Sequence, residues 1–382
     1  QMGEGEARWF PRRGREHPKC WYRLAMERLR VGVLGATGLA GQQVLAALEG
    51  HPWFTVSAVA GSPSSAGKTF GAALREASGA SRWFADGPPE PSVLELPCLT
   101  AEDLLKQPID ILFSAVSKDV ALEWEPRFAA RVPVISTASA FRYEPDVPIL
   151  IPGINDGHAE ALREQRRRRG WKGFIAPIPN CTTTGLAVSL KPLQDAFGLR
   201  SVMMTSLQAV SGAGRHGGVL ALDVIDNVIP YIPEEEEKVE RETRKILGAW
   251  GAPGAFALSC TCTRVNVQHG HTEAVFVGTE RACDARSAAE ALNAFAPAGL
   301  KGLPSAPERL LVVDSDPFRP QPRRDRDAGD GMTVTVGRLR DEPVLKGVKY
   351  VVLSHNTKLG AGKGAVLVAE LLKREGYVER AA

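Results

Sequence analysis

The chain has 382 residues, a length that suggests two domains rather than a single core. Hydrophobic residues make up 44% and charged residues 24%, as in water-soluble globular proteins, and no apolar run reaches the length of a membrane span. The formal net charge of +3 is too small to indicate a nucleic-acid partner. The six cysteines lack the dense spacing of a secreted disulfide framework, so we expect a cytoplasmic protein.

The N-terminal segment, residues 1–29, mixes charged residues with prolines and lacks the apolar core of a secretion signal. We predict a disordered extension here, and Met26 offers an alternative start just before the first strand. We assign no function to this segment.

The first strongly patterned stretch is Arg30-Val-Gly-Val-Leu-Gly35-Ala-Thr-Gly-Leu-Ala-Gly41, and an amphipathic run follows it. An apolar strand, a glycine turn and a helix in this order predict a dinucleotide site. Glycines permit the tight turn, the approach of a pyrophosphate and close packing of helix on strand, while backbone N–H groups bind the phosphates. We therefore assign cofactor binding to Gly35, Thr37, Gly38, Leu39, Ala40 and Gly41.

The next predicted strand, Phe54–Ala60, leads into Gly-Ser62-Pro-Ser-Ser65-Ala-Gly-Lys68. An NAD enzyme commonly carries Asp or Glu at this point for the ribose hydroxyl. Hydroxyls and a lysine suit a 2′-phosphate instead, so the sequence favours NADP over NAD. The same residues are also typical of a simple turn.

Two further buried strands are predicted at 108–116 and 133–136, with helical sequence between them. Arg142 follows the second strand and is suited to an anionic substrate, although an arginine in such a loop is more often a surface charge. The run from Arg166 to Arg169 we interpret as an exposed helix end rather than a phosphate or RNA site.

The stretch Ile178-Pro-Asn180-Cys181-Thr-Thr-Thr-Gly185 precedes an apolar periodic run, which predicts a capped helix with the thiol at its first turn. Unpaired N–H groups and the helix dipole stabilise negative charge there, so Cys181 is a candidate nucleophile with a lowered pKa. A small buried cysteine at an ordinary helix start is the alternative.

Beyond Cys181 the pattern changes to that of an α+β domain. A strand from Val202 enters a glycine-rich loop at 211–214, and residues 260–267 and 272–277 alternate like antiparallel strands. The acidic residues 234–237 open a helix.

Two kinds of metal-binding or catalytic side chain fall on these strands. Cys260 and Cys262 share one strand face, and their spacing does not indicate a metal site. His269 and His271 are candidates for the base that a thiol nucleophile needs, although both could be surface residues of a turn.

A late strand at 350–354 precedes a glycine-containing loop and a helix at 365–372. This order predicts a return to the cofactor domain. We therefore divide the chain into an NADP-binding domain, residues 30–179 and 350–382, and a catalytic and dimerisation domain, residues 180–349.

Taken together, these stretches resemble the aspartate-semialdehyde dehydrogenase family, in particular its archaeal and fungal-type branch. The likeness extends from Arg30 to about Leu372 and rests on nine motifs in order. They are Gly35-Ala-Thr-Gly-Leu-Ala-Gly41, Ser65-Ala-Gly-Lys68, Asn180-Cys-Thr-Thr183, Gln208-Ala-Val-Ser-Gly-Ala-Gly214, Asp226-Asn-Val-Ile-Pro-Tyr231, Glu235-Glu-Glu-Lys238, Arg264-Val-Asn-Val-Gln-His-Gly-His271, Arg319-Pro-Gln-Pro322 and Ser354-His-Asn356.

The resemblance implies an α/β fold: a Rossmann-type domain joined to an α+β catalytic and dimerisation domain of the glyceraldehyde-3-phosphate-dehydrogenase type. It implies a homodimer or homotetramer that uses NADP to reduce 4-aspartyl phosphate to aspartate 4-semialdehyde, in the biosynthesis of lysine, methionine and threonine. Cys181 would carry the acyl group as a thioester, an activated species that accepts hydride.

By the same resemblance, His271 is the general acid/base and Gln208 positions the substrate or its oxyanion. The implied substrate contacts are Arg264 to the carboxylate, Glu235 to the amino group, Lys238 and Arg142 to the phosphate, and Asn180 beside the thiol. The implied further cofactor contacts are Ser62, Ser65, Gly185, Ser211, Gly212 and Asn356.

Several residues depart from the family's usual motifs. They are Thr137, Gly153, Arg215, His216, Asn266, Leu359 and Lys363, of which Gly153, Arg215 and His216 could alter substrate preference near the site. A malonyl-CoA or succinyl-CoA reductase with the same cysteine and histidine is the nearest alternative. A non-catalytic NADP-binding or nucleic-acid-binding protein is a more distant one.

Overall fold

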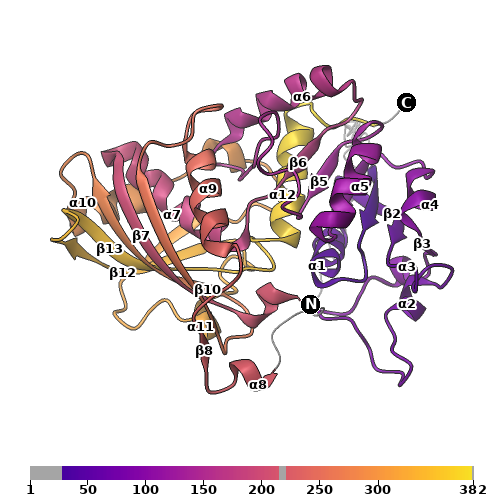
Figure 1. Ribbon diagram of the computed structural model, residues 1–382, viewed down its shortest axis with the longest axis horizontal. Helices are drawn as coiled ribbons and strands as arrows, with labels where there is room; N and C mark the ends of the chain where they lie inside the picture. Colours follow the sequence, from indigo (N-terminus) through magenta and orange to yellow (C-terminus); the bar gives the residue numbers. More distant parts are fainter. Residues whose placement is uncertain (1–27, 215–220, 381–382) are drawn as a thin grey trace, which may run out of the picture.

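The computed structural model describes residues 28–214 and 221–380 of the chain. Two domains, each built on its own sheet, lie side by side (Figure 1). The predicted N-terminal extension lies almost wholly outside the described residues.

The first domain contains a six-stranded parallel sheet in the order β3-β2-β1-β4-β5-β6. Its strands are β1 Leu29–Leu34, β2 Phe54–Ala60, β3 Cys98–Leu99, β4 Ile111–Ser114, β5 Val134–Ser136 and β6 Ile175–Pro177. Because β1 lies between β2 and β4, the strand order reverses at β1. In open α/β sheets this reversal opens a ligand-binding crevice at the carboxyl ends of the strands.

Helices cover both faces of this sheet, as expected for strands that read as continuous apolar runs. Apolar side chains of α1 and α12 fill the core on one face, and those of α4 and α5 fill the core on the other. The helices of this domain are α1 Leu39–Leu48, α2 Phe70–Ala73, α3 Pro91–Leu94, α4 Ala101–Leu105, α5 Lys118–Ala129, α6 Ala161–Arg169 and α12 Gly362–Arg374, with a 3₁₀ turn η1 at Asp156–Glu160.

The second domain contains a seven-stranded mixed sheet in the order β11-β12-β13-β10-β7-β9-β8. Its strands are β7 Leu199–Gln208, β8 Val228–Ile229, β9 Ala257–Val265, β10 His271–Thr279, β11 Leu311–Asp314, β12 Val334–Glu342 and β13 Gly347–Ser354. The predicted strands at 260–267 and 272–277 correspond to β9 and β10, which run in opposite directions but do not pair. β7 lies between them, parallel to β9 and antiparallel to β10.

One face of the mixed sheet packs on helices and the other is left open. The helical segments of this domain are α7 Cys181–Phe197, α8 Ala221–Val224, α9 Glu235–Leu247, α10 Ala285–Ala294 and α11 Pro322–Asp325, with 3₁₀ turns η2 Val210–Ala213 and η3 Ala298–Leu300. Side chains of α7, α9 and α10 share one core with the inward face of the sheet. On β7, Val202 and Met204 point into this core, whereas Met203 and Leu207 are exposed on the opposite face.

The predicted domain boundary at residue 350 is wrong for the strand that follows it. Residues 350–354 belong to β13, which pairs antiparallel with β10 and β12 in the mixed sheet. Its apolar side chains fit the second core as well as they would fit the first, so composition did not separate the two. The chain returns to the first domain only after Ser354, where α12 packs against α1.

Candidate active site

Three neighbouring strands of the mixed sheet bring their polar residues to one edge. Gln208 at the end of β7 pairs in register with Arg264 of β9. His271 opens β10, next to the same end of β7, because Thr272 pairs with Leu207. Arg264 and His271 follow Gln208 by 56 and 63 positions in the sequence, yet the strand pairing brings all three to the same edge of the sheet.

The thiol enters this edge from the first turn of α7, as the sequence predicted. Asn180 caps the helix: its side-chain oxygen accepts hydrogen bonds from the backbone N–H groups of Thr182 at 2.8 Å and Thr183 at 3.3 Å. Cys181 is partly exposed, whereas the three threonines that follow it are buried. The cap thus fixes Cys181 at the first turn of α7, where the residue is only partly exposed.

Cys181 and His271 form a close pair, with Sγ 3.2 Å from Nε2. The backbone N–H of Ala209 donates to Nδ1 of the same ring at 3.0 Å. Because a donor faces Nδ1, the proton of the neutral imidazole lies on Nε2 and points toward the sulfur. Gly212 crosses over the pair, where a Cβ would lie 3.0 Å from Arg264 Nη1 and 3.3 Å from His271 Nε2.

The predicted lowering of the thiol pKa is wrong for this structure. Burial raises the pKa of the Cys181 thiol to about 12, and the Glu235 carboxylate raises it too, whereas Arg264 and Arg142 oppose the rise. Desolvation therefore outweighs the helix terminus. Burial, with Arg264 and His355 nearby, lowers the pKa of His271 to about 3, so both partners are neutral at pH 7.

Glu235, the first residue of α9, receives three hydrogen bonds from around the thiol. Asn180 Nδ2 donates to its Oε1 at 2.9 Å, Gln208 Nε2 at 3.2 Å and Thr182 Oγ1 at 3.4 Å. All of these donors among the described residues contact Oε1, and none contacts Oε2. The carboxylate is thus held in place with one oxygen left for a cationic ligand.

Arg264 supplies the opposite charge at the same edge. It is only 5% exposed, and its Nη1 donates to the carbonyl oxygen of Ala209 at 2.9 Å. Its Nε is buried and has no hydrogen-bond partner within the described chain. A buried guanidinium with an unused donor is suited to a carboxylate ligand.

Arg142 is deeply buried, and the alternative reading of a surface charge does not hold. It is 5% exposed, donates to Glu242 Oε1 at 2.9 Å and to the carbonyl of Thr137 at 2.9 Å, and keeps a buried Nε without a partner in the described residues. Glu242 also accepts from the backbone N–H of Asn180 at 2.6 Å. Glu242, a residue of α9 that the sequence analysis did not identify, therefore connects Arg142 to the loop that precedes Cys181.

Lys238 lies one turn into α9 from Glu235. Its Nζ is 3.2 Å from Glu234 Oε2, and 24% of its side chain is exposed. The lysine can therefore turn toward a ligand at little cost, because an exposed ion pair is weak.

The glycine loop of the first domain has the geometry that a dinucleotide requires. Gly35 has φ +82°, and a Cβ there would lie 2.3 Å from the carbonyl oxygen of Ala115. A Cβ on Gly41 would lie 2.2 Å from the carbonyl oxygen of Gly35. Helix α1 begins at Leu39 without a side-chain cap, so within the described chain the N–H groups of its first turn are available to phosphate oxygens.

A cavity of about 170 Å³ adjoins this loop. It is lined by Thr37, Gly38, Leu39, Gln42, Ser62, Ser65, Arg82 and Phe84. Five of the predicted cofactor residues, Thr37, Gly38, Leu39, Ser62 and Ser65, line this cavity. The residues present fit a dinucleotide. Lys68, which the sequence had suggested for a 2′-phosphate, is exposed and does not line the cavity.

The remaining predicted cofactor residues divide into two groups. Ser211, Gly212 and Asn356 lie beside His271: Asn356 donates to Ser211 Oγ at 2.8 Å and accepts from the backbone N–H of Gly270 at 2.9 Å. Gly185 is instead buried in α7, where a Cβ would lie 2.5 Å from Ser354 Oγ. The close packing of α7 on β13 therefore explains why a glycine stands at position 185.

Two family models match this arrangement of domains. Residues 30–162 match the semialdehyde dehydrogenase NAD binding domain, and residues 190–359 match the semialdehyde dehydrogenase dimerisation domain. The chain belongs to the semialdehyde dehydrogenase family.

The names of similar proteins are consistent with membership of this family. An aspartate-semialdehyde dehydrogenase of Methanothermobacter thermautotrophicus is 43% identical over 350 residues, which cover 90% of this chain and 99% of the relative. A malonyl CoA reductase (NADP) of Metallosphaera sedula is 36% identical over 363 residues, covering 92% and 99%. The crystal structure of the Candida albicans aspartate-semialdehyde dehydrogenase with NADP superposes with a TM-score of 0.81 at 36% identity, over 92% of this chain and 100% of that one.

The departures from the family motifs have different places in the structure. Gly153 has φ +83° and would meet Pro297 at 2.9 Å with a Cβ, so it is a turn residue and not a neighbour of the thiol. Thr137 holds Arg142 through its carbonyl. Lys363 pairs with Asp330 at 2.5 Å. Arg215 and His216 lie outside the described residues.

The arginine run at the end of α6 is only partly an exposed helix end. Arg167 and Arg168 are exposed, whereas Arg166 donates to the carbonyl of Tyr377 at 2.6 Å and Arg169 pairs with Asp146 at 2.6 Å. Two of the four side chains thus fasten the chain's own segments together.

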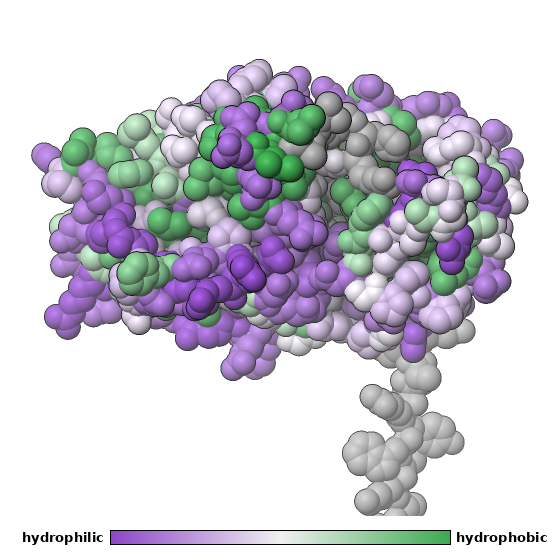
Figure 2. All heavy atoms as spheres, turned by 90° about the horizontal axis from the view of Figure 1, so that it is seen from below, coloured by the Kyte–Doolittle hydropathy of each residue, from purple (hydrophilic) through white to green (hydrophobic). Residues whose placement is uncertain are grey.

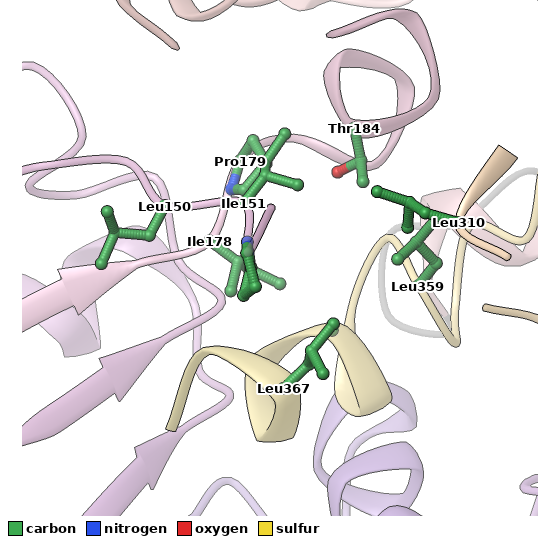
Figure 3. Close-up of a pocket in the computed structure, with 10 residues that line it drawn as sticks. Leu150, Ile151, Ile178, Pro179, Thr184, Leu310, Leu359 and Leu367 are labelled. Atoms are coloured by element: carbon green, nitrogen blue, oxygen red, sulfur yellow. The ribbon is translucent and has the colours of Figure 1, made fainter. Parts of the chain in front are cut away.

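An apolar cavity of about 10 Å³ lies behind the thiol loop (Figure 3). Leu367 of α12 points into it from one side, and Pro179 and Thr184 border it from the other (Figure 3). It is scarcely large enough for one water and offers too few polar partners to hold one. We interpret it as the packing seam between α12 and the start of α7.

Within residues 28–214 and 221–380, no group of three or more His, Cys, Asp or Glu side chains could hold a metal ion. In the same part of the chain, no helix has the length and apolar character needed to cross a membrane. Cys260 and Cys262 are both buried on one face of β9, as predicted.

Proposed function

We propose that the chain is an NADP-dependent aspartate-semialdehyde dehydrogenase that interconverts 4-aspartyl phosphate and aspartate 4-semialdehyde. The observation that carries this proposal is the Cys181–His271 pair at 3.2 Å, flanked by a buried carboxylate, Glu235, and a buried guanidinium, Arg264. The names of the relatives support it. The reaction belongs to the biosynthesis of lysine, methionine and threonine.

The two fixed charges match the two ends of an amino acid. Glu235 would bind the substrate ammonium through its unused Oε2, and Arg264 would bind the α-carboxylate. Asn180 and Gln208 keep Glu235 in position through their hydrogen bonds to Oε1. Lys238 and Arg142 would bind the phosphoryl group that leaves or enters.

In the biosynthetic direction, Cys181 Sγ attacks the acyl carbon of the substrate, and phosphate leaves with the electrons of its C–O bond and takes up the proton of the thiol. The product of this step is a thioester on Cys181, which is more reactive toward hydride than an ester. Because Glu235 contributes to the high pKa of Cys181, neutralising Glu235 with the substrate ammonium favours the thiolate.

His271 would act through the proton on Nε2. With Ala209 N–H at Nδ1, the neutral ring donates to the thiolate and then to the carbonyl oxygen that gains negative charge. We therefore assign to His271 the acid side of the general acid/base role that the resemblance implied.

NADP would be held by the glycine loop with Gly35, Thr37, Gly38, Leu39, Ala40 and Gly41. Ser62 and Ser65 would bind its ribose end, and Ser211, Gly212 and Asn356 its nicotinamide end beside His271. When bound, the cofactor supplies the hydride that reduces the thioester.

A malonyl-CoA or succinyl-CoA reductase is the second candidate, because the Metallosphaera sedula relative bears the first of these names. Such substrates have no amino group, so Oε2 of Glu235 would remain without a partner. The acyl phosphate of an amino acid uses both fixed charges and is therefore preferred.

The test measures reduction of NADP with aspartate semialdehyde or malonate semialdehyde, each with phosphate or coenzyme A as the acyl acceptor. We expect fast turnover only with aspartate semialdehyde and phosphate. A preference for malonate semialdehyde and coenzyme A would contradict the proposal and favour the second candidate. The Arg167→Ala/Arg168→Ala variant, which loses two exposed arginines, should keep full turnover.

The family's dimerisation domain supports oligomerisation, and we propose a homodimer or homotetramer formed through the second domain. Met203, 54% exposed, and Leu207, 42% exposed, lie on the face of β7 that no described helix covers. The face carrying α8 and β8 also shows a group of hydrophobic side chains on a largely polar surface (Figure 2). Light scattering should give a dimer or larger for the wild type and a smaller species for Met203→Glu.

A cytoplasmic location is part of the same proposal. Cys98, Cys181, Cys260, Cys262 and Cys283 are free thiols in the structure. Free cysteines are usual where thiols are kept reduced.

A further inference from the structure

We propose that Arg82 recognises the 2′-phosphate of NADP and so sets the preference for NADP over NAD. The inference deepens the proposed function, since it rests on a dinucleotide in the cavity beside the glycine loop. Nothing in the sequence motifs points to this residue, which lies between α2 and α3.

The cavity has one charged side chain among the described residues that line it, and this is Arg82. Ser62 and Ser65, in the turn that follows β2, line the same cavity. Ser62 Oγ lies 3.3 Å from Ser65 Oγ, and neither the turn nor the end of β2 carries a carboxylate. Two hydroxyls and a guanidinium are the donors that a phosphate dianion binds, and a ribose hydroxyl gains nothing from the guanidinium's charge.

The backbone of Arg82 is fixed on both sides. Its N–H donates to the carbonyl of Leu74 at 2.7 Å, and its carbonyl accepts from Gln42 Nε2 at 2.8 Å. Gln42, only 1% exposed, also donates to the carbonyl of Thr37 at 3.0 Å and accepts from the N–H of Phe84 at 2.7 Å. One buried side chain therefore couples the position of Arg82 to the glycine loop.

The guanidinium itself is available. Arg82 is partly exposed, and within the described chain its side chain has no hydrogen bond, ion pair or ring contact. Other arginines of the structure, such as Arg30 with Asp110, are bound to carboxylates. A fixed backbone with an unengaged guanidinium, in the cavity that Ser62 and Ser65 also line, is what a 2′-phosphate site requires.

The test measures the dissociation constants of NADP, NAD, 2′,5′-ADP and 5′-AMP by calorimetry, for wild type, Arg82→Gln and Arg82→Lys. We expect Arg82→Gln to weaken NADP and 2′,5′-ADP by about tenfold to a hundredfold, the range of a lost charge-assisted hydrogen bond. NAD and 5′-AMP should change by less than about twofold, because they lack the phosphate. Arg82→Lys should recover part of the loss, since it keeps a charge but not the fork of donors.

Two matched variants complete the test. Arg75→Gln removes an exposed arginine of the same segment, whose side chain donates to the carbonyl of Gly79 at 3.1 Å. This variant should bind all four ligands as wild type does. Lys68→Gln removes the lysine that the sequence had favoured and should also leave the NADP preference intact.

The inference is overturned if Arg82→Gln keeps the NADP preference, if it weakens NAD as much as NADP, or if Lys68→Gln alone removes the preference. A wild-type chain that binds neither dinucleotide overturns it together with the proposed cofactor. Intact NADP binding without oxidation of aspartate semialdehyde contradicts only the proposed reaction.

Discussion

At the edge of the parallel sheet, the nucleotide-binding loop takes its shape from backbone atoms of one short stretch, in which Gly35 and Gly41 come into contact. The thiol pocket instead gathers side chains from α7, α9 and three strands of the mixed sheet. A local loop is specified by its own glycines, whereas the pocket depends on the packing of the whole second domain. The two regions should therefore respond differently to substitution.

The largest effect is expected at His271, where the pocket depends on one proton donor. His271→Ala should lower kcat by about 10³-fold, the loss usual for an oxyanion donor. His271→Gln keeps an N–H at the same end of the side chain and should lose much less, about 10- to 100-fold. Steady-state kinetics with both variants checks this expectation.

The pH profile provides the control for this prediction. Because the folded pKa of His271 is about 3, the wild-type rate should show no titration of an imidazole between pH 5 and 8. A limb near pH 6 to 7 that disappears in both variants would identify His271 as a base and contradict the donor role.

Gly41→Ala tests the local region and should have the next largest effect. The added Cβ would lie 2.2 Å from the carbonyl oxygen of Gly35, so the loop must shift. We expect NADP binding to weaken by about 100-fold and stability to fall by about 1 to 3 kcal/mol. Calorimetric binding and thermal unfolding measure the two effects. Gly157→Ala, where a Cβ meets nothing within 4 Å, should change neither.

Glu235→Gln separates the charge of the pocket from its shape. The variant replaces the carboxylate by an amide of similar shape. It therefore removes the negative charge that is one of the causes of the high pKa of the Cys181 thiol. Below the pKa, the thiolate fraction rises tenfold per pH unit, so a lowered pKa means faster alkylation at every pH from 7 to 9.

Iodoacetamide alkylation of Cys181 measures this change, and we expect about tenfold acceleration, as for a shift of one pKa unit. At the same time the KM for aspartate semialdehyde should rise. Glu237→Gln, an exposed residue of the same helix turn, serves as the control. Equal alkylation rates in wild type and Glu235→Gln would remove Glu235 as a determinant of thiol reactivity.

The smallest effect is expected at Glu273, a wholly buried carboxyl of β10 whose oxygens have no hydrogen-bond partner in the described chain. Burial raises its pKa well above the ordinary value, so the folded state binds one more proton than the unfolded state above about pH 4.3. Stability should therefore fall as the pH rises from there to the folded pKa, by at most about 1.4 kcal/mol per pH unit.

Glu273→Gln cannot ionise and should show a flatter pH dependence of the free energy of unfolding than wild type. Urea titrations between pH 5 and 8 measure both slopes. Parallel slopes would show that Glu273 does not carry this proton.

The first domain could be predicted well because its signals are local. The strand Phe54–Ala60 was predicted with its observed bounds, and the glycines of the loop have the contacts that the motif implied. Arg82 was missed because a hydrogen bond from Gln42, 40 residues away in the sequence, fixes its backbone beside the cavity. A periodic pattern contains no such information.

The second domain could be predicted in kind but not in detail. The helix cap at Asn180 is local and was found, whereas the thiol pKa depends on burial by segments far along the chain. Glu242 acts only through a contact with Arg142, 100 residues away. The apolar strand at 350–354 fitted either core, and only its pairing with β10 and β12 decided between them.

The central claim is that Cys181 carries the acyl group of an amino acid as a thioester. The most direct measurement is intact-mass and peptide mass spectrometry of the enzyme after aspartate semialdehyde and NADP are added without phosphate. We expect one aspartyl adduct on Cys181, released by phosphate and absent from Cys181→Ser. Full phosphate-dependent turnover with no adduct at Cys181, or an unchanged rate in Cys181→Ser, would contradict it.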